Sequence, residues 1–313
     1  MGFGSFVRLA SIGCAVVSGI VACEGAPPPP AEVPADRLLA YVDRQLAFGP
    51  RPPGSPGHAA MAAWLDSAAR ARADTVIPDD WTAVTSKGDS LRLHNVLASF
   101  RPDLTERVLY VAHWDTRPRA DAAASADTSA PVMGANDGAS GVAVLLGVAD
   151  ALKARPAPVG VDLLFVDGED YGDFNDSTET LLGARRFARR VRGAYQPRLA
   201  IVWDMVGDRD QRFVKEGASV TGVPARVESV WRCAARLGYR EQFVDSVSQP
   251  IIDDHLPLQR VGLEAIDVID LVYGPGNRWH HTTEDTRDKI SGASLARAAH
   301  VASAMIRGCG GRR

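Results

Sequence analysis

The sequence predicts an α/β fold in which a mostly parallel central sheet is flanked by helices on both faces. Strand-length apolar runs alternate with segments that are apolar at helical spacing from residue 36 onward, which is the pattern of such folds. Several runs, such as residues 161–166, are apolar almost throughout, as strands buried on both faces are. No repeat and no internal linker interrupts the alternation, so we expect a single domain over residues 36–313.

The elements are predicted in order along the chain. Helices are expected over residues 38–47 and 58–71, on either side of a rigid Pro- and Gly-rich loop over residues 51–57. Residues 95–100 and 108–112 are predicted to be neighbouring strands, and residues 120–130, rich in Ala, Asp and Ser, a surface loop. Later elements follow the same reasoning: helix 138–154, strand 161–166, helix 180–192, strand 199–203, helix 224–237, strand 264–271 and a last helix from 291 to about 306.

The N-terminal segment is expected to lie outside the fold. Arg8 precedes a short apolar run over residues 9–22, which is typical of a secretory signal and too short to span a bilayer comfortably. Its end, Ile20-Val21-Ala22-Cys23, resembles the lipobox of bacterial lipoproteins, where the Cys becomes the lipidated first residue. We expect a signal peptide over residues 1–22, a lipid anchor at Cys23 on a periplasm-facing membrane, and a proline-rich spacer over residues 23–35. The alternative is an ordinary cleaved signal in which Cys23 is incidental.

Charge and cysteine content narrow the possible functions. The formal net charge is −3, which gives no sign of nucleic-acid binding, and the arginines over residues 185–192 indicate a solvated helix face. Cys233 and Cys309 could pair in an oxidising compartment, but two cysteines do not make a disulfide framework. Because no Cys-x-x-Cys pair is present, any metal must be held by His and carboxylate side chains.

Polar side chains stand where the predicted strands end. They are His113 and Asp115, Glu169 and Asp170, Asp204, Asp137 in a Gly-rich turn before a helix, and His281 after the last strand region. Ligands of open α/β sheets bind beyond the carboxyl ends of the strands, so these residues are expected to converge. Imidazole and carboxylate together suit zinc, and Glu169 is left over to move protons. The pattern therefore indicates a zinc enzyme that acts on an amide.

Each residue by itself also has a purely structural explanation. Asp137 could cap a helix, His113 could be a satisfied core histidine, and His281 could belong to a capping loop. The adjacent carboxylates Glu169 and Asp170 are harder to explain without a cation, because they end a buried strand and repel each other. The joint occurrence of all these residues favours a site.

At these motifs the chain resembles the glutaminyl cyclases (glutaminyl-peptide cyclotransferases) of the animal type found in some bacteria, which share a fold with the zinc aminopeptidases. The resemblance covers residues 48–306. It runs through RPPGSPG at 51–57, AHWDTRP at 112–118, GANDGASGV at 134–142, GEDYG at 168–172, DMVG at 204–207, DDH at 253–255 and HTTEDT at 281–286.

The resemblance implies a role for each matching residue. Asp137, Asp170 and His281 would hold one zinc ion, and Glu169 would be the general base and acid. Asp204 and Asp253 would form a hydrogen-bond network with Glu169. The substrates would be peptide or protein N-termini, whose glutamine becomes pyroglutamate.

Two features of the resemblance leave alternatives open. In two-zinc aminopeptidase relatives, His113 and Asp204 would bind a second zinc, with Asp115 orienting His113. Such relatives usually carry Ser at the position of Asp253.

The family usually has Trp directly before the ligand His, whereas this chain has Trp279-His280-His281. His280 is therefore an alternative ligand, and either Trp279 or His280 is expected in the substrate pocket. Asp170 stands where many relatives have Glu. A non-enzymatic ligand-binding lipoprotein is disfavoured, because every catalytic-type position is filled.

Overall fold

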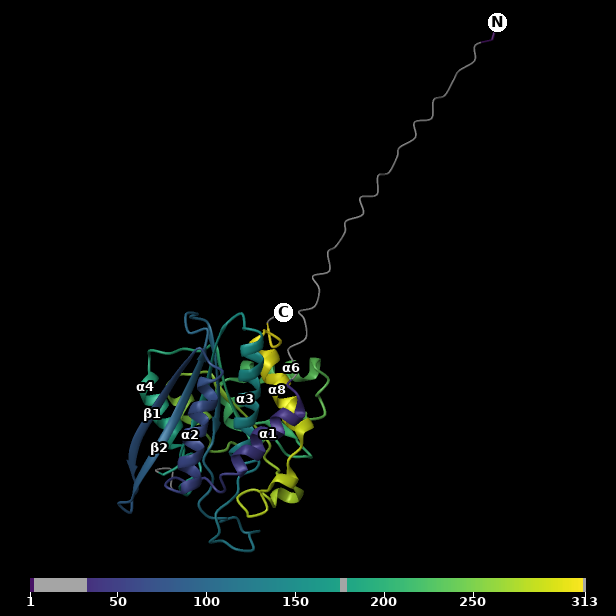
Figure 1. Cartoon of the computed structure of the whole chain (residues 1–313). Helices are drawn as coiled ribbons and strands as arrows, with labels where there is room; N and C mark the ends of the chain where they lie inside the picture. The colour runs from purple at the N-terminus through teal and green to yellow at the C-terminus, as the bar shows by residue number, and fades with distance from the viewer. Residues whose placement is uncertain (3–32, 175–178, 312–313) are drawn as a thin grey trace.

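The computed structural model describes residues 1–2, 33–174 and 179–311 (Figure 1). Cys23 and most of the predicted signal peptide and proline-rich spacer lie outside the described residues. Within the described part of the chain, no helix is both long and apolar enough to cross a membrane.

A six-stranded mixed sheet forms the centre of the domain, with the strand order β1-β2-β4-β3-β5-β8. β3 pairs in parallel with β4 and β5, and β5 pairs in parallel with β8, whereas β1 with β2 and β2 with β4 are antiparallel. The strands are β1 (Thr75–Val84), β2 (Ser90–Phe100), β3 (Arg107–His113), β4 (Gly160–Val166), β5 (Leu199–Asp204) and β8 (Ala265–Ile269). The predicted α/β fold with a mostly parallel sheet is confirmed.

Two details of the predicted sheet are wrong. The strands expected to be neighbours, β2 and β3, are separated by β4, which pairs with both of them. β4 is buried along its whole length, so it needs a strand on either side. The sequence of the β2–β3 segment carries no sign that β4 lies between these two strands. In addition, β1 was not predicted, because it is an edge strand in which Pro78 and two acidic residues interrupt the apolar pattern.

Helices cover both faces of this sheet, as predicted. On one face α1 (Ala35–Leu46), α3 (Ala139–Ala154) and α8 (Gly292–Ile306) pack together, flanked by α2 (Pro56–Arg70) and α6 (Pro224–Arg236) (Figure 1). On the other face lie α4 (Leu182–Val191) and α7 (His255–Arg260). The short helix α5 (Gly217–Gly222) and a two-stranded sheet of β6 (Phe213–Lys215) and β7 (Phe243–Val247) stand beside β8.

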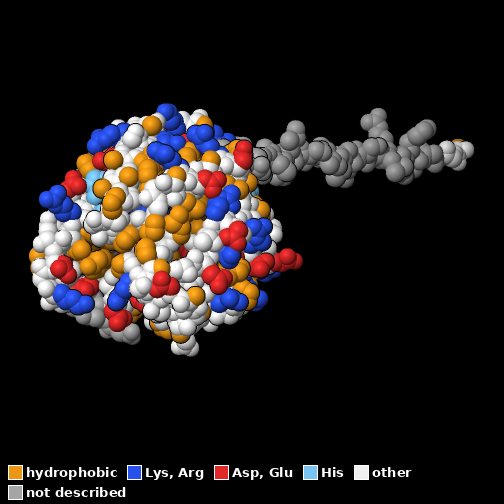
Figure 2. All heavy atoms as spheres, turned by 60° about the horizontal axis from the view of Figure 1, so that its bottom comes forward, with side chains coloured by type: hydrophobic (Ala, Val, Ile, Leu, Met, Phe, Trp, Pro, Cys, Tyr) orange, Lys and Arg blue, Asp and Glu red, His pale blue; other side chains and the backbone are white. Residues whose placement is uncertain are grey.

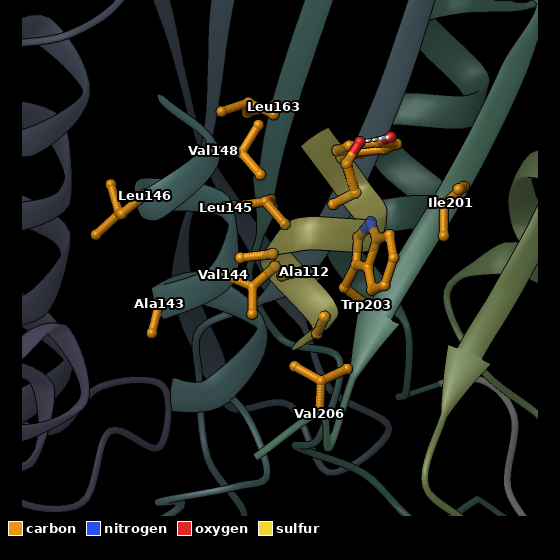
Figure 3. Close-up of a cluster of buried hydrophobic side chains, with 14 of the residues drawn as sticks. Ala112, Ala143, Val144, Leu145, Leu146, Val148, Leu163, Ile201, Trp203 and Val206 are labelled. Carbon is orange, nitrogen blue, oxygen red and sulfur yellow. Dashed lines mark hydrogen bonds between the residues drawn. The ribbon is translucent and has the colours of Figure 1, made fainter. Parts of the chain in front are cut away.

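Alternation along the strands divides the core into two apolar layers. Tyr110 and Ala112 of β3 face the α3 side, while Leu109 and Val111 face the α4 and α7 side. Figure 3 shows the larger layer, in which Val144, Leu145 and Val148 of α3 lie against Ala112, Ile201 and Trp203 of the sheet. A Cβ added at Gly141 would lie 2.1 Å from the Trp203 carbonyl oxygen, so only glycine allows α3 this close to β5.

Close packing of α3 onto the sheet matters for function because the Gly-rich turn with Asp137 directly precedes this helix. The core therefore fixes where Asp137 lies relative to the strand ends.

A disulfide joins two helical segments later in the chain. It links Cys233 of α6 with Cys309, just after α8.

Candidate active site

A cavity of about 500 Å³ opens where β4 and β5 end, beside the loops before α3 and before α8. Its walls are largely apolar, with Phe174, Met205, Ile251, Ile252, Ile269 and Leu271, and its polar lining includes Asp137, Glu169, Asp204, Asp253, His280 and His281. Figure 2, which brings the bottom of Figure 1 forward, shows hydrophobic side chains gathered across the middle of that face. An apolar pocket with a few convergent polar groups is the usual form of a small-substrate site.

Asp137, Asp170 and His281 come together at this cavity from three distant segments. The Nε2 atom of His281 lies 3.6 Å from Asp137 Oδ2 and 3.5 Å from Asp170 Oδ1. Asp170 Oδ2 is buried and has no hydrogen-bond partner among the described residues. Burial, helped by neighbouring His280, lowers the pKa of His281 to about 3, so the imidazole is neutral and able to bind a metal. The donor set therefore fits a zinc ion.

The turn that carries Asp137 is held by two buried charged residues. Arg51 is fully buried and donates hydrogen bonds to the carbonyl oxygens of Trp114, Met133 and Gly134. The carboxylate of Asp285 accepts hydrogen bonds from the main-chain N–H groups of Asn136, at 2.8 Å, and Asp137, at 3.1 Å. Both residues lie inside the sequence motifs RPPGSPG and HTTEDT, but no local pattern predicts their role, because their contacts are with backbone far away in the chain.

The strand end that carries Glu169 and Asp170 is held in the same way. The carboxylate of Asp115 accepts hydrogen bonds from the main-chain N–H groups of Glu169 and Asp170. Arg117 donates to Asp170 Oδ1 at 2.8 Å and makes two further bonds with Asp121. Asp115 also lies 3.6 Å from His113 Nδ1, so it contacts the predicted histidine as well as fixing this turn.

His113 stands between the carboxylates at the floor of the site. Its Nε2 atom lies 3.1 Å from Asp137 Oδ1 and 3.2 Å from Asp204 Oδ1, and its Nδ1 atom lies 3.7 Å from Glu169 Oε2. Burial disfavours a charged imidazole, but Glu169 and Asp204 outweigh it and raise the pKa of His113 well above its ordinary value. Donor atoms of His113, Asp137 and Asp204 lie within 4.8 Å of one another, so these side chains are also a candidate metal group.

Glu169, Asp204 and Asp253 all line the cavity. Burial raises the pKa of Glu169 well above its ordinary value; nearby Asp170 and Asp253 add to this rise, while His113 opposes it. Burial also raises the pKa of Asp204 to about 6. Carboxyl groups of this kind can hold and release a proton near neutral pH.

The two histidines of the Trp279-His280-His281 segment occupy different places. His280 lines the cavity with its ring 3.8 Å from that of His281, and its Nε2 atom lies 3.9 Å from Asp137 Oδ2. His281 contacts both Asp137 and Asp170, which favours it as the ligand. Trp279 packs against Tyr273 and lies under Lys289, so the extra histidine takes the position in the pocket.

Comparisons with known proteins identify relatives of this chain. The sequence model of Peptidase family M28 matches residues 95–306. A crystal structure of Porphyromonas gingivalis glutaminyl cyclase is 33% identical to the chain, with a TM-score of 0.80 over 87% of this chain and 98% of that one. A leucine aminopeptidase precursor from Bacteroides thetaiotaomicron is 32% identical, with a TM-score of 0.82 over 89% and 98%. The glutaminyl-peptide cyclotransferase-like protein of Bos taurus is 24% identical over 282 residues, covering 82% of this chain and 71% of the bovine protein.

Proposed function

Since this chain belongs to Peptidase family M28, we propose that it is a zinc-dependent glutaminyl-peptide cyclotransferase. It converts the N-terminal glutamine of a peptide to pyroglutamate and releases ammonia. The observation that carries this proposal is the carboxyl group of Asp253, which lines the cavity together with Glu169 and Asp204. Two-zinc aminopeptidases are expected to have a serine hydroxyl there, and the similarity to bacterial glutaminyl cyclases supports the same choice.

One zinc ion would be held by Asp137, Asp170 and His281. When bound, zinc supplies a Lewis acid that polarises the side-chain amide carbonyl of the substrate glutamine. The neutral imidazole of His281 and the unpaired Oδ2 atom of Asp170 support this ligand set. Arg117 and Asp285 hold the ligands in place through the hydrogen bonds described above.

Glu169 moves the proton in this reaction. The α-amine of the substrate attacks its own side-chain amide carbon, so a carbon–nitrogen bond forms and closes a five-membered ring. Glu169 takes a proton from the attacking amine and delivers it to the leaving nitrogen as the old carbon–nitrogen bond breaks, which gives ammonia. Asp204 and Asp253 bind the amine and keep it oriented, and the apolar walls exclude water that would otherwise hydrolyse the amide. Because nucleophile and electrophile belong to one residue, the enzyme mainly has to fold the substrate.

A second candidate function uses the same scaffold as a two-zinc aminopeptidase. The candidate metal group of His113, Asp137 and Asp204 favours it, as does the similarity to the leucine aminopeptidase precursor. Against it stands the carboxyl group of Asp253 in the cavity, where such aminopeptidases are expected to carry a serine hydroxyl.

Mass spectrometry distinguishes the two reactions. We would incubate the purified protein, loaded with zinc, with one peptide that begins with glutamine and one that begins with leucine. Loss of ammonia from the glutamine peptide alone is the expected result, with one zinc per chain. Removal of the terminal residue, together with two zinc ions per chain, would instead favour the aminopeptidase.

We also propose that Cys23 anchors the protein to a membrane on its periplasmic side. The lipobox-like Ile20-Val21-Ala22-Cys23 after an apolar run supports this proposal. The proline-rich segment that follows would hold the catalytic domain away from the bilayer.

A further inference from the structure

We propose that two buried residues behind the cavity, His255 and Glu216, are positioning residues that orient Asp253 toward the substrate amine. This inference rests on the proposed function and extends its network away from the substrate. Asp253 lines the cavity, whereas His255, Glu216 and Asp267 are fully or almost fully buried behind it.

Glu216 is a fixed anion at the base of this group. Its Oε1 atom accepts hydrogen bonds from the main-chain N–H groups of Ala218, at 2.8 Å, and Ile251, at 3.0 Å. Its Oε2 atom accepts from both the main-chain N–H and the hydroxyl of Ser219. Burial raises the pKa of Glu216, but His255 and the donor at Ala218 outweigh it and lower the pKa to about 2. The charge on Glu216 is therefore held in one place by four donors.

Glu216 and Ser219 also tie down the two segments that carry the paired carboxyls. The bond from Ile251 fixes the loop two residues before Asp253. The main-chain N–H of Asp267 donates to the Ser219 hydroxyl at 3.0 Å, which fixes β8 to the same turn of α5. One polar turn thus determines how Asp253 and Asp267 lie relative to each other.

His255 connects this anion with the paired carboxyls. Its Nε2 atom lies 3.2 Å from Glu216 Oε2, and its Nδ1 atom lies 3.7 Å from Asp267 Oδ2. Donor atoms of His255, Asp253 and Asp267 all lie within 4.8 Å of one another. The imidazole thus lies between the carboxyl groups of Glu216 and Asp267, an arrangement in which charged neighbours favour one orientation of the ring.

Asp253 and Asp267 lie side by side in this group, each with a carboxyl oxygen within 4.8 Å of the other's. Two ionised carboxylates this close repel each other. Burial raises the pKa of Asp267 well above its ordinary value, and neighbouring Asp253 raises it further, so the protonated form of Asp267 is favoured. A protonated Asp267 would donate to Asp253 and so orient the Asp253 carboxyl group toward the cavity that it lines.

A double-mutant cycle separates positioning from a merely structural role. We would measure ammonia release from a glutamine-initiated peptide for the wild type, His255→Gln, Asp253→Asn and the double variant, all loaded with zinc. His255→Gln is expected to lower kcat by about 10- to 100-fold while KM stays unchanged, because a small misplacement of a reacting group costs this much. The double variant should be no slower than Asp253→Asn alone.

His94→Gln is the matched control, since His94 is also a buried histidine beside two carboxylates, Asp66 and Asp80, but outside the cavity. It should keep the wild-type kcat. Additive losses in the double variant, or an equal loss in His94→Gln, would overturn the positioning role. So would a second zinc ion in the wild type that disappears in His255→Gln, because these side chains would then be metal ligands.

Nitrogen NMR of the histidine rings gives a readout that needs no turnover and keeps the test valid if the variant kinetics fail. Asp253→Asn is expected to shift both ring nitrogens of His255 and to leave those of His94 unchanged. Unmoved His255 signals would overturn the inference. A wild type that does not cyclise the peptide would contradict the proposed function, and the NMR comparison would still decide whether His255 and Asp253 are coupled.

Discussion

Glu169→Gln is the substitution that most directly tests the proposed chemistry. The side chain keeps its size and loses only its charge and its ability to accept a proton. Its ion contact is with His113 Nδ1 at 3.7 Å, and His113 retains Asp137 and Asp204 as partners. The main-chain bond from Glu169 to Asp115 does not depend on the side chain. Little of the structure therefore rests on the carboxylate.

The expected effect on rate follows from the role of a general base. Losing such a group lowers kcat by about 10²- to 10⁴-fold, which corresponds to roughly 3–5 kcal/mol of activation free energy. The thermal stability of Glu169→Gln, in contrast to its kcat, should rise or stay unchanged. Burial and the neighbouring carboxyls raise the pKa of Glu169, so its charged form is disfavoured in the fold. A neutral amide removes that repulsion, and the melting temperature should not fall.

Three measurements check this prediction together: ammonia release, zinc content and thermal melting by circular dichroism. Glu106→Gln is the control, because Glu106 forms an exposed ion pair with Arg198 before β3 begins. It should behave as the wild type in all three measurements. A Glu169→Gln variant with wild-type kcat would refute proton transfer by this residue. A variant that lost zinc along with activity would show that Glu169 is a metal ligand instead.

Three further predictions concern the ligands, the turn and the anchor. His281→Ala should lose zinc while His280→Ala retains it, because only His281 contacts both Asp137 and Asp170. Metal analysis of the two variants tests this, and the reverse result would make His280 the ligand. Arg51→Met should lower the free energy of unfolding by about 3–5 kcal/mol in denaturant titrations, because it leaves buried carbonyl oxygens unpaired. A loss below about 1 kcal/mol would show that the turn with Asp137 is stable without Arg51. Cys23→Ser should move the protein from the membrane fraction to the soluble fraction, and unchanged fractionation would argue against lipidation.

Much of the fold was predictable because its signals are local. Apolar runs at strand length and helical spacing placed β3, β4, β5, α3 and α8 close to their observed bounds. The rule that ligands bind at strand ends predicted that Asp137, Glu169, Asp204 and His281 would converge, and all four line the cavity. Strand order was not predictable in the same way, since pairing depends on contacts between distant segments, as the insertion of β4 between β2 and β3 illustrates.

The sequence by itself determined the chemical types at the site: an imidazole and carboxylates at the ends of buried strands, and Asp253 in the DDH segment. Only the tertiary structure decided which groups support them. The supporting groups act through hydrogen bonds to main-chain groups remote in sequence, as Arg51, Asp285 and Glu216 do. Such bonds produce no periodic pattern in the sequence. The structure also favours His281 over His280 as the ligand, because the comparison depends on the position of Asp170, more than a hundred residues earlier. Local patterns specify residues, whereas the folded backbone specifies which of them meet.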